Sequence, residues 1–549
     1  MHIDLEKTEL DELDTPICVI GAGAAGIALT RRLLDAGQTV TLLESGGLDY
    51  EQDIADLNAG ENVGEAYYQL EHSRLRFFGG TTAIWGGRLA ELDPVDFEKR
   101  GWVPHSGWPI TRKELEPYYK QARKLFGIPA EGLDEKDLGA ANIYLPEFDP
   151  GRIRVKHWYF DNRSNRFTFD SCRDLERHPR CTVITHATVT AIEADPHAGR
   201  ITSLCIQSLS RRLLTLRARV FVLAAGGIEN PRLLLASRSV MKQGLGNAHD
   251  LVGRFFMEHP HARGGRLDTD CAWKLLRTFG RRHRLNGQQV AALITPSETR
   301  QAEKAILNTS LTLAPRQPAN KNQFWGMRAY NRLKHDLAPT RKTRNLWLHA
   351  KKAAAHAQLV VDPLRPWLLH KLNRVELALL VRAEQAPNPD SRITLQNDDR
   401  DSLGIPRVRL DWRFSELDIH SVDMLVADLG RETERLGLGR IEPAEWLSGT
   451  DRRWKMDMLV SAHPYGGFHH MGTTRMADDP RQGVTDRQGR VHGIANLYVA
   501  GSSLFPTSGW ANPTLTIVAL ALRTADHIAG RMDRGGAPEI AEKRLEPVS

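Results

Sequence analysis

Apolar residues near the N-terminus form a short run, a helical repeat and a second short run. Residues 17–20 are all apolar and end at Gly21, apolar positions from Ala25 to Ala36 follow helical spacing, and residues 39–44 form a second run ending at Glu44. Short apolar runs bounded by turn residues favour buried strands, and three- to four-residue spacing favours an amphipathic helix. The pattern therefore predicts strand, glycine turn, helix and strand, the beginning of an α/β fold.

Similar apolar runs recur far along the chain, at residues 220–227 and 496–501, and both contain a terminal glycine. Strands end in this way where the backbone approaches a ligand closely. Because these distant runs have the same short, apolar pattern as the predicted N-terminal strands, we expect a nucleotide-binding domain built from discontinuous segments. We place this domain at residues 15–95, 180–260 and 459–535.

A second domain is expected between these segments, because 549 residues exceed one compact core. We assign it residues 96–179 and 261–458, where charge is denser and where residues 392–395 and 406–412 predict strands of an antiparallel sheet. Residues 1–14 and 536–549 are predicted to be terminal tails, the second one polar and loose.

The first turn carries the pattern Gly21-x-Gly23-x-x-Gly26, and Glu44 ends the next predicted strand. The glycines permit a tight turn, close contact of main chain with a pyrophosphate, and packing of the helix on the strand, while the helix N-terminus offers amides to the phosphate. An acid at the position of Glu44 can bind a ribose hydroxyl. The alternatives are a plain tight turn for the glycines and a surface position for Glu44.

A second glycine-rich segment, Phe78 to Gly87, places four glycines and two threonines around Trp85. This composition suits a loop that lies against a large planar ligand and its phosphates. FAD and NAD share the first fingerprint, and the loop favours FAD in part. The alternative is an ordinary glycine-rich connection.

Five segments in the same order resemble the glucose-methanol-choline (GMC) oxidoreductase family: Gly21 to Gly26 with Glu44, Gly79 to Gly87, residues 224–234, His469 to Met476, and Gly509 to Thr516. They span nearly the whole chain, and the amino-acid sequences of the last two segments are most similar to the sugar-oxidising branch of the family. The resemblance implies a Rossmann-like FAD-binding domain, a substrate domain with an antiparallel sheet and helices, and a site at the reactive edge of the flavin.

The resemblance also implies which positions bind the cofactor. These are Gly21, Gly23, Ala24, Ala25, Gly26, Glu44, Gly79, Gly80, Thr81, Thr82, Ile84, Trp85, Gly86, Gly87, Val189, Ala225, Gly226, Gly501, Ser502, Asn512, Pro513 and Thr514. Some family members link FAD covalently through a histidine immediately before the loop tryptophan. Ile84 occupies that position here, so noncovalent FAD is expected.

Oxidation of an alcohol by a flavin requires a base for the hydroxyl proton, and a neutral imidazole can accept it near physiological pH. The candidates are His463, His469 and His470. Adjacent residues of an extended segment point to opposite faces, so at most one of the last two should face the substrate. The family motif H-x-x-G-T places the base at His469. The alternatives are His470 as the base or a structural role for all three, and His259 in the segment Phe256 to Pro260 is interpreted as structural rather than catalytic.

Asn512 precedes Pro513 and an apolar helical pattern, which predicts that Asn512 is the N-cap and Pro513 the first residue of a helix. Capping alone is one interpretation. The resemblance adds a catalytic role, in which the amide nitrogen binds the substrate hydroxyl while the oxygen caps. The N-terminus of this helix would also favour negative charge on a reduced flavin.

The five cysteines show no C-x-x-C spacing, which indicates neither a disulfide framework nor a zinc site, and no metal is expected. Residues 1–14 contain six acids and one lysine, unlike a secretory signal. No run approaches the roughly 18 apolar residues of a membrane span. A reducing, cytoplasmic location fits these features best.

The net charge of +7 is concentrated between Arg328 and Arg382, where twelve Lys or Arg face three Asp or Glu. This stretch also contains Trp347 and Trp367. It is interpreted as a solvated insertion, as a surface for an anionic substrate or redox partner, or as a peripheral membrane contact. No motif supports nucleic acid binding.

Together these features predict FAD-dependent oxidation of a secondary alcohol of a sugar or glycoside, with His469 as base and Asn512 as its hydrogen-bonding partner. The electron acceptor, whether oxygen, a quinone or a redox protein, stays open. The rival functions are a non-redox lyase on the same scaffold and a flavin-containing subunit of an electron-transfer complex.

Overall fold

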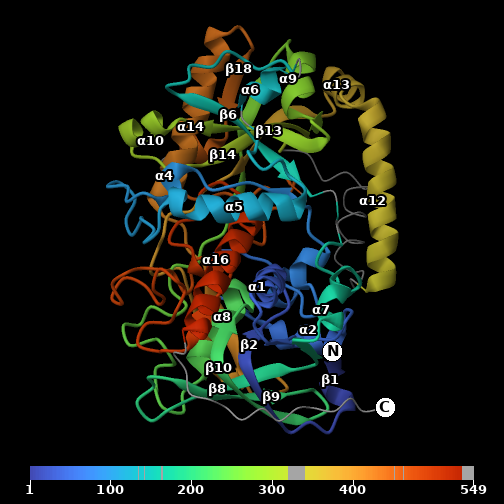
Figure 1. The fold of residues 1–549 in the computed structure, drawn as a ribbon. Coiled ribbons are helices and arrows are strands. Elements are labelled where there is room, and N and C mark those ends of the chain that lie inside the picture. The colour runs from blue at the N-terminus through green and yellow to red at the C-terminus, as the bar shows by residue number, and fades with distance from the viewer. Residues whose placement is uncertain are drawn as a thin grey trace.

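Two large β-sheets, one with a parallel centre and one antiparallel, form the lower and upper halves of the molecule in Figure 1. The computed structural model describes residues 1–133, 135–140, 143–161, 163, 165–319, 340–449, 452–461 and 463–534. The helices lie on and between the two sheets, so segments from both halves meet at the centre of the molecule.

The lower sheet has the order β1-β7-β3-β2-β10-β9-β8, with β19 paired to β10 beyond the end of β9. The pairs from β1 through β10, and β10 with β19, are parallel, whereas β9 is antiparallel to both of its neighbours. The strands are β1 (His2–Asp4), β2 (Glu12–Ile20), β3 (Val40–Leu43), β7 (Cys181–Thr185), β8 (Thr188–Ala194), β9 (Ile201–Gln207), β10 (Leu213–Leu223) and β19 (Leu497–Val499).

Three helices follow strands of this sheet and turn back over it: α1 (Ala24–Asp35), α8 (Gly226–Ala236) and α16 (Thr514–Asp533). The helices α1 and α16 pack together, and Arg32 binds Asp526 across their contact at 2.5 Å. The predicted strand, turn, helix and strand at the N-terminus are thus present. The α/β fold class is confirmed, and the distant apolar runs at residues 220–227 and 496–501 do supply strands of one sheet.

The upper sheet is antiparallel and has the order β18-β11-β15-β14-β13-β6-β5, with β12 paired to β13. Its strands are β5 (Arg88–Leu89), β6 (Ile153–Phe160), β11 (His261–Asp268), β12 (His283–Leu285), β13 (Gln288–Pro296), β14 (Ser310–Arg316), β15 (Glu376–Arg382) and β18 (Arg440–Pro443). The helices around it are α5 (Arg112–Phe126), α9 (Ala272–Phe279), α10 (Glu298–Lys304), α13 (Leu364–Lys371) and α14 (Glu416–Arg435).

A third, small sheet joins β4 (Gly60–Asn62), β17 (Pro406–Asp411) and β16 (Arg392–Arg400). The two strands predicted at residues 392–395 and 406–412 do pair antiparallel, but they lie here rather than in the large antiparallel sheet. Because β4 pairs with β17 and β5 pairs with β6, two strands pair across the predicted domain boundaries. The division into two domains stays a prediction.

Short helical turns connect these elements. They are α2 (Gln52–Ala55), α3 (Leu70–Ser73), α4 (Pro94–Phe97), α6 (Glu135–Ala140), α7 (Arg173–Arg177), α15 (Glu445–Ser448), and the 3-10 turns η1 (Leu5–Lys7), η2 (Asp56–Asn58), η3 (Gly80–Ala83), η4 (Phe169–Cys172) and η5 (Ser502–Leu504).

The N-terminal residues do not form the predicted tail. Residues 2–4 form β1, which extends the lower sheet beyond β7, and the α-amino group of Met1 donates to the carbonyl of Cys181 at 2.8 Å. The tail was predicted from polarity alone, and polarity does not exclude a short edge strand. The predicted tail at residues 536–549 lies outside the described residues.

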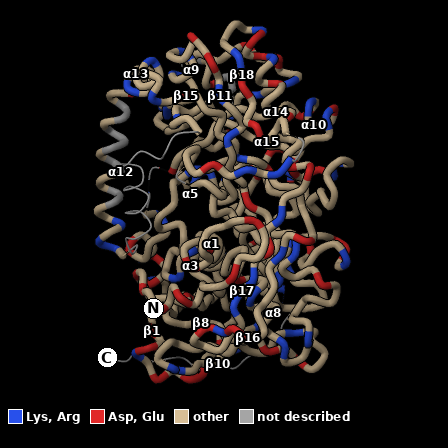
Figure 2. The backbone as a smooth tube through the Cα atoms, turned by 180° about the vertical axis from the view of Figure 1, so that it is seen from behind, with Lys and Arg blue, Asp and Glu red and all other residues tan. Residues whose placement is uncertain are grey.

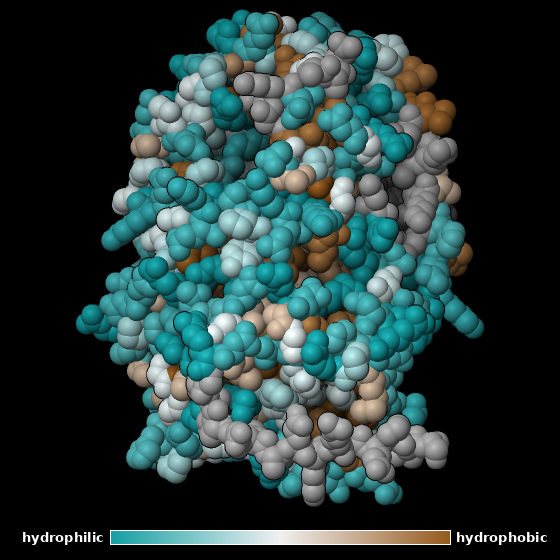
Figure 3. All heavy atoms as spheres, in the orientation of Figure 1, coloured by the Kyte–Doolittle hydropathy of each residue, from teal (hydrophilic) through white to brown (hydrophobic). Residues whose placement is uncertain are grey.

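The basic stretch contributes α12 (Arg341–Val361), which stands along one side of the molecule in Figures 1 and 2. At its N-terminus Arg344 binds Asp49 at 3.0 Å, and beyond its C-terminus Trp367 of α13 contacts Trp273 of α9 edge-on. The segment therefore spans both halves. Figure 3 shows apolar atoms gathered at the upper right, near α13, where Leu364, Leu368 and Leu372 are exposed.

The three interpretations of the basic stretch remain open, and its residues 328–339 lie outside the described residues. Among the helices that the structure describes, none is long and apolar enough to cross a bilayer.

A continuous apolar core passes from the lower sheet through α1, α5 and α16 into the upper sheet. In the lower sheet, Phe221 of β10 is fully buried. Where α5 crosses α16, the hydroxyl groups of Tyr119 and Thr516 are hydrogen-bonded at 2.8 Å. The two halves are therefore held together by shared packing.

Replacing Phe221 with alanine should lower the free energy of unfolding by about 3–5 kcal/mol, because it opens a cavity in the core. The urea midpoint, followed by circular dichroism, measures this loss. The matched control is Leu213→Ala on the same strand, where the side chain is 63% exposed and the expected change is within about 0.5 kcal/mol. Equal midpoints for the two variants would contradict the placement of β10.

Candidate functional site

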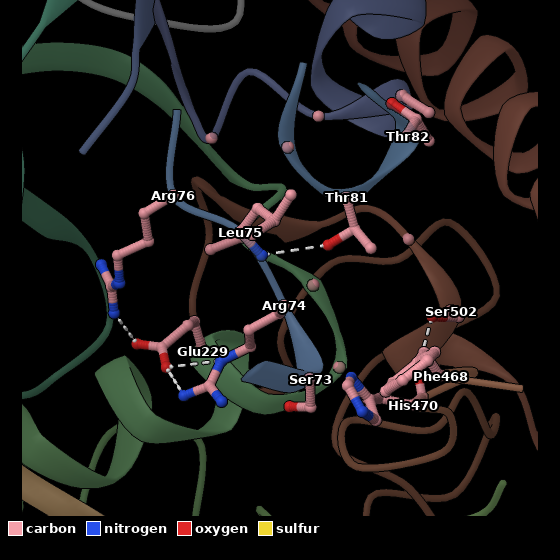
Figure 4. A pocket seen from close by; sticks show the side chains of 18 of the residues that line it. Ser73, Arg74, Leu75, Arg76, Thr81, Thr82, Glu229, Phe468, His470 and Ser502 are labelled. Atoms are coloured by element: carbon pink, nitrogen blue, oxygen red, sulfur yellow. Dashed lines mark hydrogen bonds and ion pairs between the residues drawn. The ribbon is translucent and has the colours of Figure 1, made fainter. Parts of the chain in front are cut away.

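One cavity of about 740 Å³ runs from the glycine turn of the lower sheet to the underside of the upper sheet. Glu44 lies among its lining residues at the nucleotide-binding turn, and His469 and Asn512 line it where the two halves meet. Figure 4 shows part of the wall, with Arg74 and Arg76 converging on Glu229 of α8. Both ion pairs measure 2.5 Å and hold in place the loop segment between Ser73 and Thr81.

The glycine turn forms because two of its residues cannot be anything larger. Gly21 has φ +106°, a left-handed conformation that favours glycine, and a Cβ at Gly26 would lie 1.9 Å from the carbonyl oxygen of Gly21. Glu44 then accepts main-chain hydrogen bonds from Ala22 at 2.9 Å and Gly46 at 3.2 Å. The carboxylate is thus tied to the turn, although burial raises its pKa.

The second glycine-rich segment folds as η3 and lines the middle of the cavity. Gly79 has φ +96°, and its N–H donates to the carbonyl of Ala22, which fastens the segment to the first turn. The indole N–H of Trp85 is buried and has no partner among the described residues. Ile84, beside it, lines the cavity and is 42% exposed.

His469 is held on three sides. Its Nδ1 lies 2.8 Å from Nδ1 of His259, its Nε2 lies 3.1 Å from Nδ2 of Asn512, and its main-chain N–H donates to Glu258 at 2.9 Å. His259 reaches it because the main chains of Met257 and Met471 form an antiparallel bridge.

These contacts determine where the proton of His469 resides. Nε2 of His259 lies 2.8 Å from the carbonyl oxygen of Gly509, and because a carbonyl only accepts, Nε2 carries the hydrogen. Nδ1 of a neutral His259 must then accept, so His469 donates from Nδ1. The lone pair of His469 is therefore on Nε2, where it accepts a hydrogen bond from Nδ2 of Asn512 at 3.1 Å in the cavity wall.

Both imidazoles are neutral at physiological pH. Burial lowers the pKa of His259 to about 4. Burial, followed by repulsion from the neighbouring histidines and Arg88, lowers the pKa of His469 well below 6.5. An unprotonated nitrogen in this position can act as a general base.

Glu258 supports the histidine segment from below. It is fully buried, accepts main-chain N–H groups of His259, Gly467 and His469, and accepts the Tyr67 hydroxyl at 2.7 Å. Burial raises its pKa to about 7. One carboxyl group therefore positions the main chain on both sides of the imidazole pair.

His470 also lines the cavity, and the expectation that at most one histidine of the pair faces the substrate stays a prediction. Its Nε2 is instead hydrogen-bonded to the Tyr67 hydroxyl at 2.9 Å, and the side chain is only 8% exposed. Its carbonyl accepts from Ser502 at 2.6 Å, as Figure 4 shows. Its ring nitrogen is thus occupied within the protein.

Asn512 is not the N-cap of the last helix. The helix α16 begins at Thr514, the capping position is Pro513, and no side chain caps it. The predicted capping role is therefore wrong, since the amide of Asn512 bonds His469 instead and the helix begins one residue later.

Most residues predicted to form the site line this one cavity. They are Gly21, Gly23, Ala24, Ala25, Glu44, Gly79, Gly80, Thr81, Thr82, Ile84, Trp85, Gly86, Val189, Ala225, Gly226, His469, His470, Gly501, Ser502, Asn512, Pro513 and Thr514. Gly26 and Gly87 do not line it. Gly26 allows α1 to pack against the turn, and the carbonyl of Gly87 accepts from Asp161.

The sequence-based interpretation missed Glu258, Tyr67 and the role of His259. His259 was interpreted as structural, yet it contacts His469 directly. The segment Phe256 to Pro260 resembled the family, and that was the available signal. Nothing in the sequence connected Tyr67 with it. Within the described residues all five cysteines are free, and no group of His, Cys, Asp or Glu could hold a metal ion.

Comparisons with known proteins agree with this geometry. A family model described as FAD dependent oxidoreductase matches residues 16–350, and one described as GMC oxidoreductase matches residues 387–521. The chain belongs to the FAD-dependent GMC oxidoreductases.

Two curated relatives match this GMC oxidoreductase over nearly its full length. A 2-methyl-1,2-propanediol dehydrogenase of Mycolicibacterium austroafricanum is 25% identical to this chain, and the alignment covers 98% of each protein. A fructose dehydrogenase large subunit of Gluconobacter japonicus is 22% identical, and the alignment covers 96% of this chain and 99% of the relative. Among solved structures, the crystal structure of formate oxidase has a TM-score of 0.54 at 17% identity, covering 96% of this chain and all of its own, and shares the fold.

The cavity of this GMC oxidoreductase fits FAD. A Cβ added at Gly23, Gly226 or Gly501 would meet no protein atom within 4 Å, so main chain lies bare along the cavity wall. The unpartnered indole N–H of Trp85 adds a free donor in the same wall. Glu44 and the N-terminus of α1 would hold the nucleotide half, and the segments ending at Ser502 and Thr514 would hold the ring.

Replacing Gly23 with alanine should leave the apoprotein folded but weaken FAD binding on the order of tenfold or more, because the new methyl group would occupy space reserved for the ligand beside bare main chain. Titration of the apoprotein with FAD measures the dissociation constant, and thermal unfolding of the apoprotein checks its stability. Gly101→Ala is the matched control, since its Cβ also meets nothing within 4 Å and it lies off the cavity. Unchanged FAD affinity in Gly23→Ala would contradict the assignment.

Proposed function

We propose that this oxidoreductase converts a secondary alcohol of a sugar or glycoside to the carbonyl. The observation that carries the proposal is the unprotonated Nε2 of His469, held beside the amide of Asn512 in the cavity that fits FAD. A relative named for a diol supports an alcohol substrate, and one named for fructose, which carries secondary hydroxyl groups, supports a sugar.

The proposed roles follow from the hydrogen-bond directions. Nε2 of His469 takes the hydroxyl proton, while Nδ2 of Asn512 donates to the substrate oxygen and orients it. Bound FAD supplies the acceptor for the hydride that leaves the carbon. Glu258 accepts the main-chain N–H of His469 and so holds in place the segment that carries the imidazole.

The second proton of His469 stays in place during this step. Nδ1 donates to His259, which donates in turn to the carbonyl of Gly509. This chain holds the imidazole ring plane and its tautomer, so His259 is a positioning residue. The same arrangement keeps Nε2 ready for the next substrate after the proton has been released.

FAD is proposed to be bound without a covalent bond. Ile84, which stands before Trp85 in the cavity wall, offers no nucleophilic atom. The lower sheet with α1, α8 and α16 is proposed as the FAD-binding domain, and the upper sheet as the substrate-binding domain. A cytoplasmic location is proposed from the acidic N-terminal segment and the free cysteines. Oxygen, a quinone and a redox protein stay open as electron acceptors.

Replacing His469 with alanine should slow anaerobic reduction of the flavin by the substrate on the order of a hundredfold or more, the scale of losing a general base. Stopped-flow absorbance measures the rate, with FAD content determined after acid precipitation, which also reports whether FAD is released. His249→Ala, at an exposed position, is the control. An unchanged rate in His469→Ala removes this residue from the mechanism, and no bleaching by any alcohol in the wild type favours the lyase.

The rate of flavin reduction should stay constant as the pH falls through 6.5, because burial and positive neighbours lower the pKa of His469 well below that value. A base acts while it is unprotonated, so a lowered pKa extends activity to lower pH. Stopped-flow rates between about pH 5 and about pH 8 test this.

A loss of rate centred at pH 6.5 would contradict the predicted profile. A loss near pH 7 that disappears in Glu258→Gln would identify Glu258, whose pKa burial raises to about 7.

A further inference from the structure

Three arginine side chains gather near the catalytic end of the cavity without a carboxylate among them. Arg88 of β5 and Arg382 of β15 line the cavity, and Arg316 of β14 lies close enough to repel Arg382. Among the described residues none of the three forms an ion pair. Within the described part of the chain, Arg382 donates to Thr312 at 3.5 Å, and Arg316 donates to the carbonyls of Pro315 and Val460.

Several more deeply buried arginines of this protein are paired with carboxylates, although Arg475, which is 4% exposed and stacks on Phe255, has no such partner among the described residues. Arg74 and Arg76 share Glu229, Arg232 binds Asp401 at 2.7 Å, and Arg100 binds Glu384 at 2.5 Å. A buried charge without a partner costs several kcal/mol, and proteins commonly avoid it. The uncompensated cluster at Arg88 and Arg382 therefore calls for a partner that the protein itself does not supply.

The guanidinium groups of the two cavity-lining arginines lie close together. Both stack on the ring of Trp158, with the guanidinium carbon 5.4 Å from its centroid for Arg88 and 5.0 Å for Arg382. The register pairs Arg88 with Phe160, so Arg88 and Trp158 share one face of the upper sheet. The Nε of Arg88 is buried and has no hydrogen-bond partner in the described chain.

Electrostatic repulsion marks the same spot. Burial, then repulsion from Arg282 and Arg316, lowers the pKa of Arg88 to about 10, and burial with repulsion from Arg88 and Arg316 lowers the pKa of Arg382. An arginine side chain keeps its proton in proteins, so both groups carry a positive charge. Arg88 also contributes to the lowered pKa of His469, so the positive field reaches the proposed base.

We propose that the alcohol substrate is an anion, a sugar acid whose carboxylate is bound by Arg88 and Arg382 while its hydroxyl faces His469. This proposal rests on the proposed function and narrows its substrate class. Guanidinium groups match the planar carboxylate and bind it through paired hydrogen bonds. The pyrophosphate of FAD does not need these arginines, because the turn that fits it belongs to the lower sheet.

The test compares aldoses with their uronic acids and their 6-phosphates, in gluco, galacto and manno forms, so that only the charged group differs within each set. Two readouts are recorded: the ligand-induced shift in thermal unfolding of the oxidised holoenzyme, and anaerobic flavin reduction. The variants are Arg88→Gln and Arg382→Met. The matched control is Arg282→Gln, which stacks on Phe160 of the same sheet at 3.7 Å but does not line the cavity.

In the wild type a uronic acid should stabilise the holoenzyme and reduce the flavin at a lower half-saturating concentration than its neutral aldose. Each cavity variant should raise the half-saturating concentration of the acid about 10- to 100-fold, the scale of losing a hydrogen bond to a charged group. The half-saturating concentration of the neutral aldose, which has no carboxylate for the arginine to bind, should not change. Arg282→Gln should behave as wild type. Arg382→Met should also unfold at the same or a higher temperature without ligand, because an unpaired buried charge is removed.

Distinct outcomes separate the two proposals. Neutral aldoses that reduce the flavin as well as their acids, with no effect of the arginine variants, would overturn the anionic substrate and leave the alcohol oxidation standing. Acids that bind through the arginines but never reduce the flavin would overturn the oxidation and leave the anion site. Preference for the 6-phosphates over the acids would overturn the carboxylate, and silence of every ligand in both readouts would overturn both proposals.

Discussion

The hydrogen bond between the two imidazole Nδ1 atoms of His469 and His259 is the constraint on which the site depends. A single proton lies between these nitrogens, which are 2.8 Å apart. The carbonyl of Gly509 determines which of the two histidines carries this proton on Nδ1. If His259 carried its hydrogen on Nδ1, His469 would have to expose a proton, rather than a lone pair, to the cavity. A main-chain carbonyl three residues before Asn512 thus sets the chemical character of the atom that Asn512 contacts.

The cavity carries two different charge environments along its length. In the lower part Arg74, Arg76 and Arg232 surround Glu229, whose pKa they hold far below its ordinary value, and the cluster serves as a wall. In the upper part Arg88 and Arg382 face the cavity without such a counterion among the described residues. This uneven distribution also disfavours protonation of His469, so binding and base catalysis draw on the same electrostatic field.

The sequence predicted the fold well where each element depends on local pattern. The turn from Gly21 to Gly26 with its strands and helix followed from periodicity and glycine spacing, and the distant strands β10 and β19 followed from their common texture. Most of the predicted site residues line one cavity. The start of α16 was misplaced by one residue, because a hydrogen bond from Asn512 to another segment took precedence over capping.

What local pattern could not predict are contacts between segments far apart in the chain. Tyr67 and Glu258 meet beneath His470 although 191 residues separate them, and no spacing rule connects an isolated tyrosine with an isolated acid. Arg88 and Arg382 likewise belong to strands of one sheet that are not neighbours, and their two side chains meet over the ring of Trp158. The pairing of β4 with β17 and of β5 with β6 across the predicted domain boundaries was likewise not visible in local pattern, and the division into domains stays a prediction.

The position of β19 has a consequence for biosynthesis. It completes the edge of β10 beside residues Phe221 to Leu223, and the chain synthesised between these two strands includes nearly the whole upper sheet. Until β19 and α16 emerge from the ribosome, that edge stays unpaired, and an open parallel edge exposes main-chain hydrogen-bonding groups to other chains. The nucleotide-binding turn is made first but its enclosure is made last, so the nascent protein passes most of its synthesis with its ligand site open.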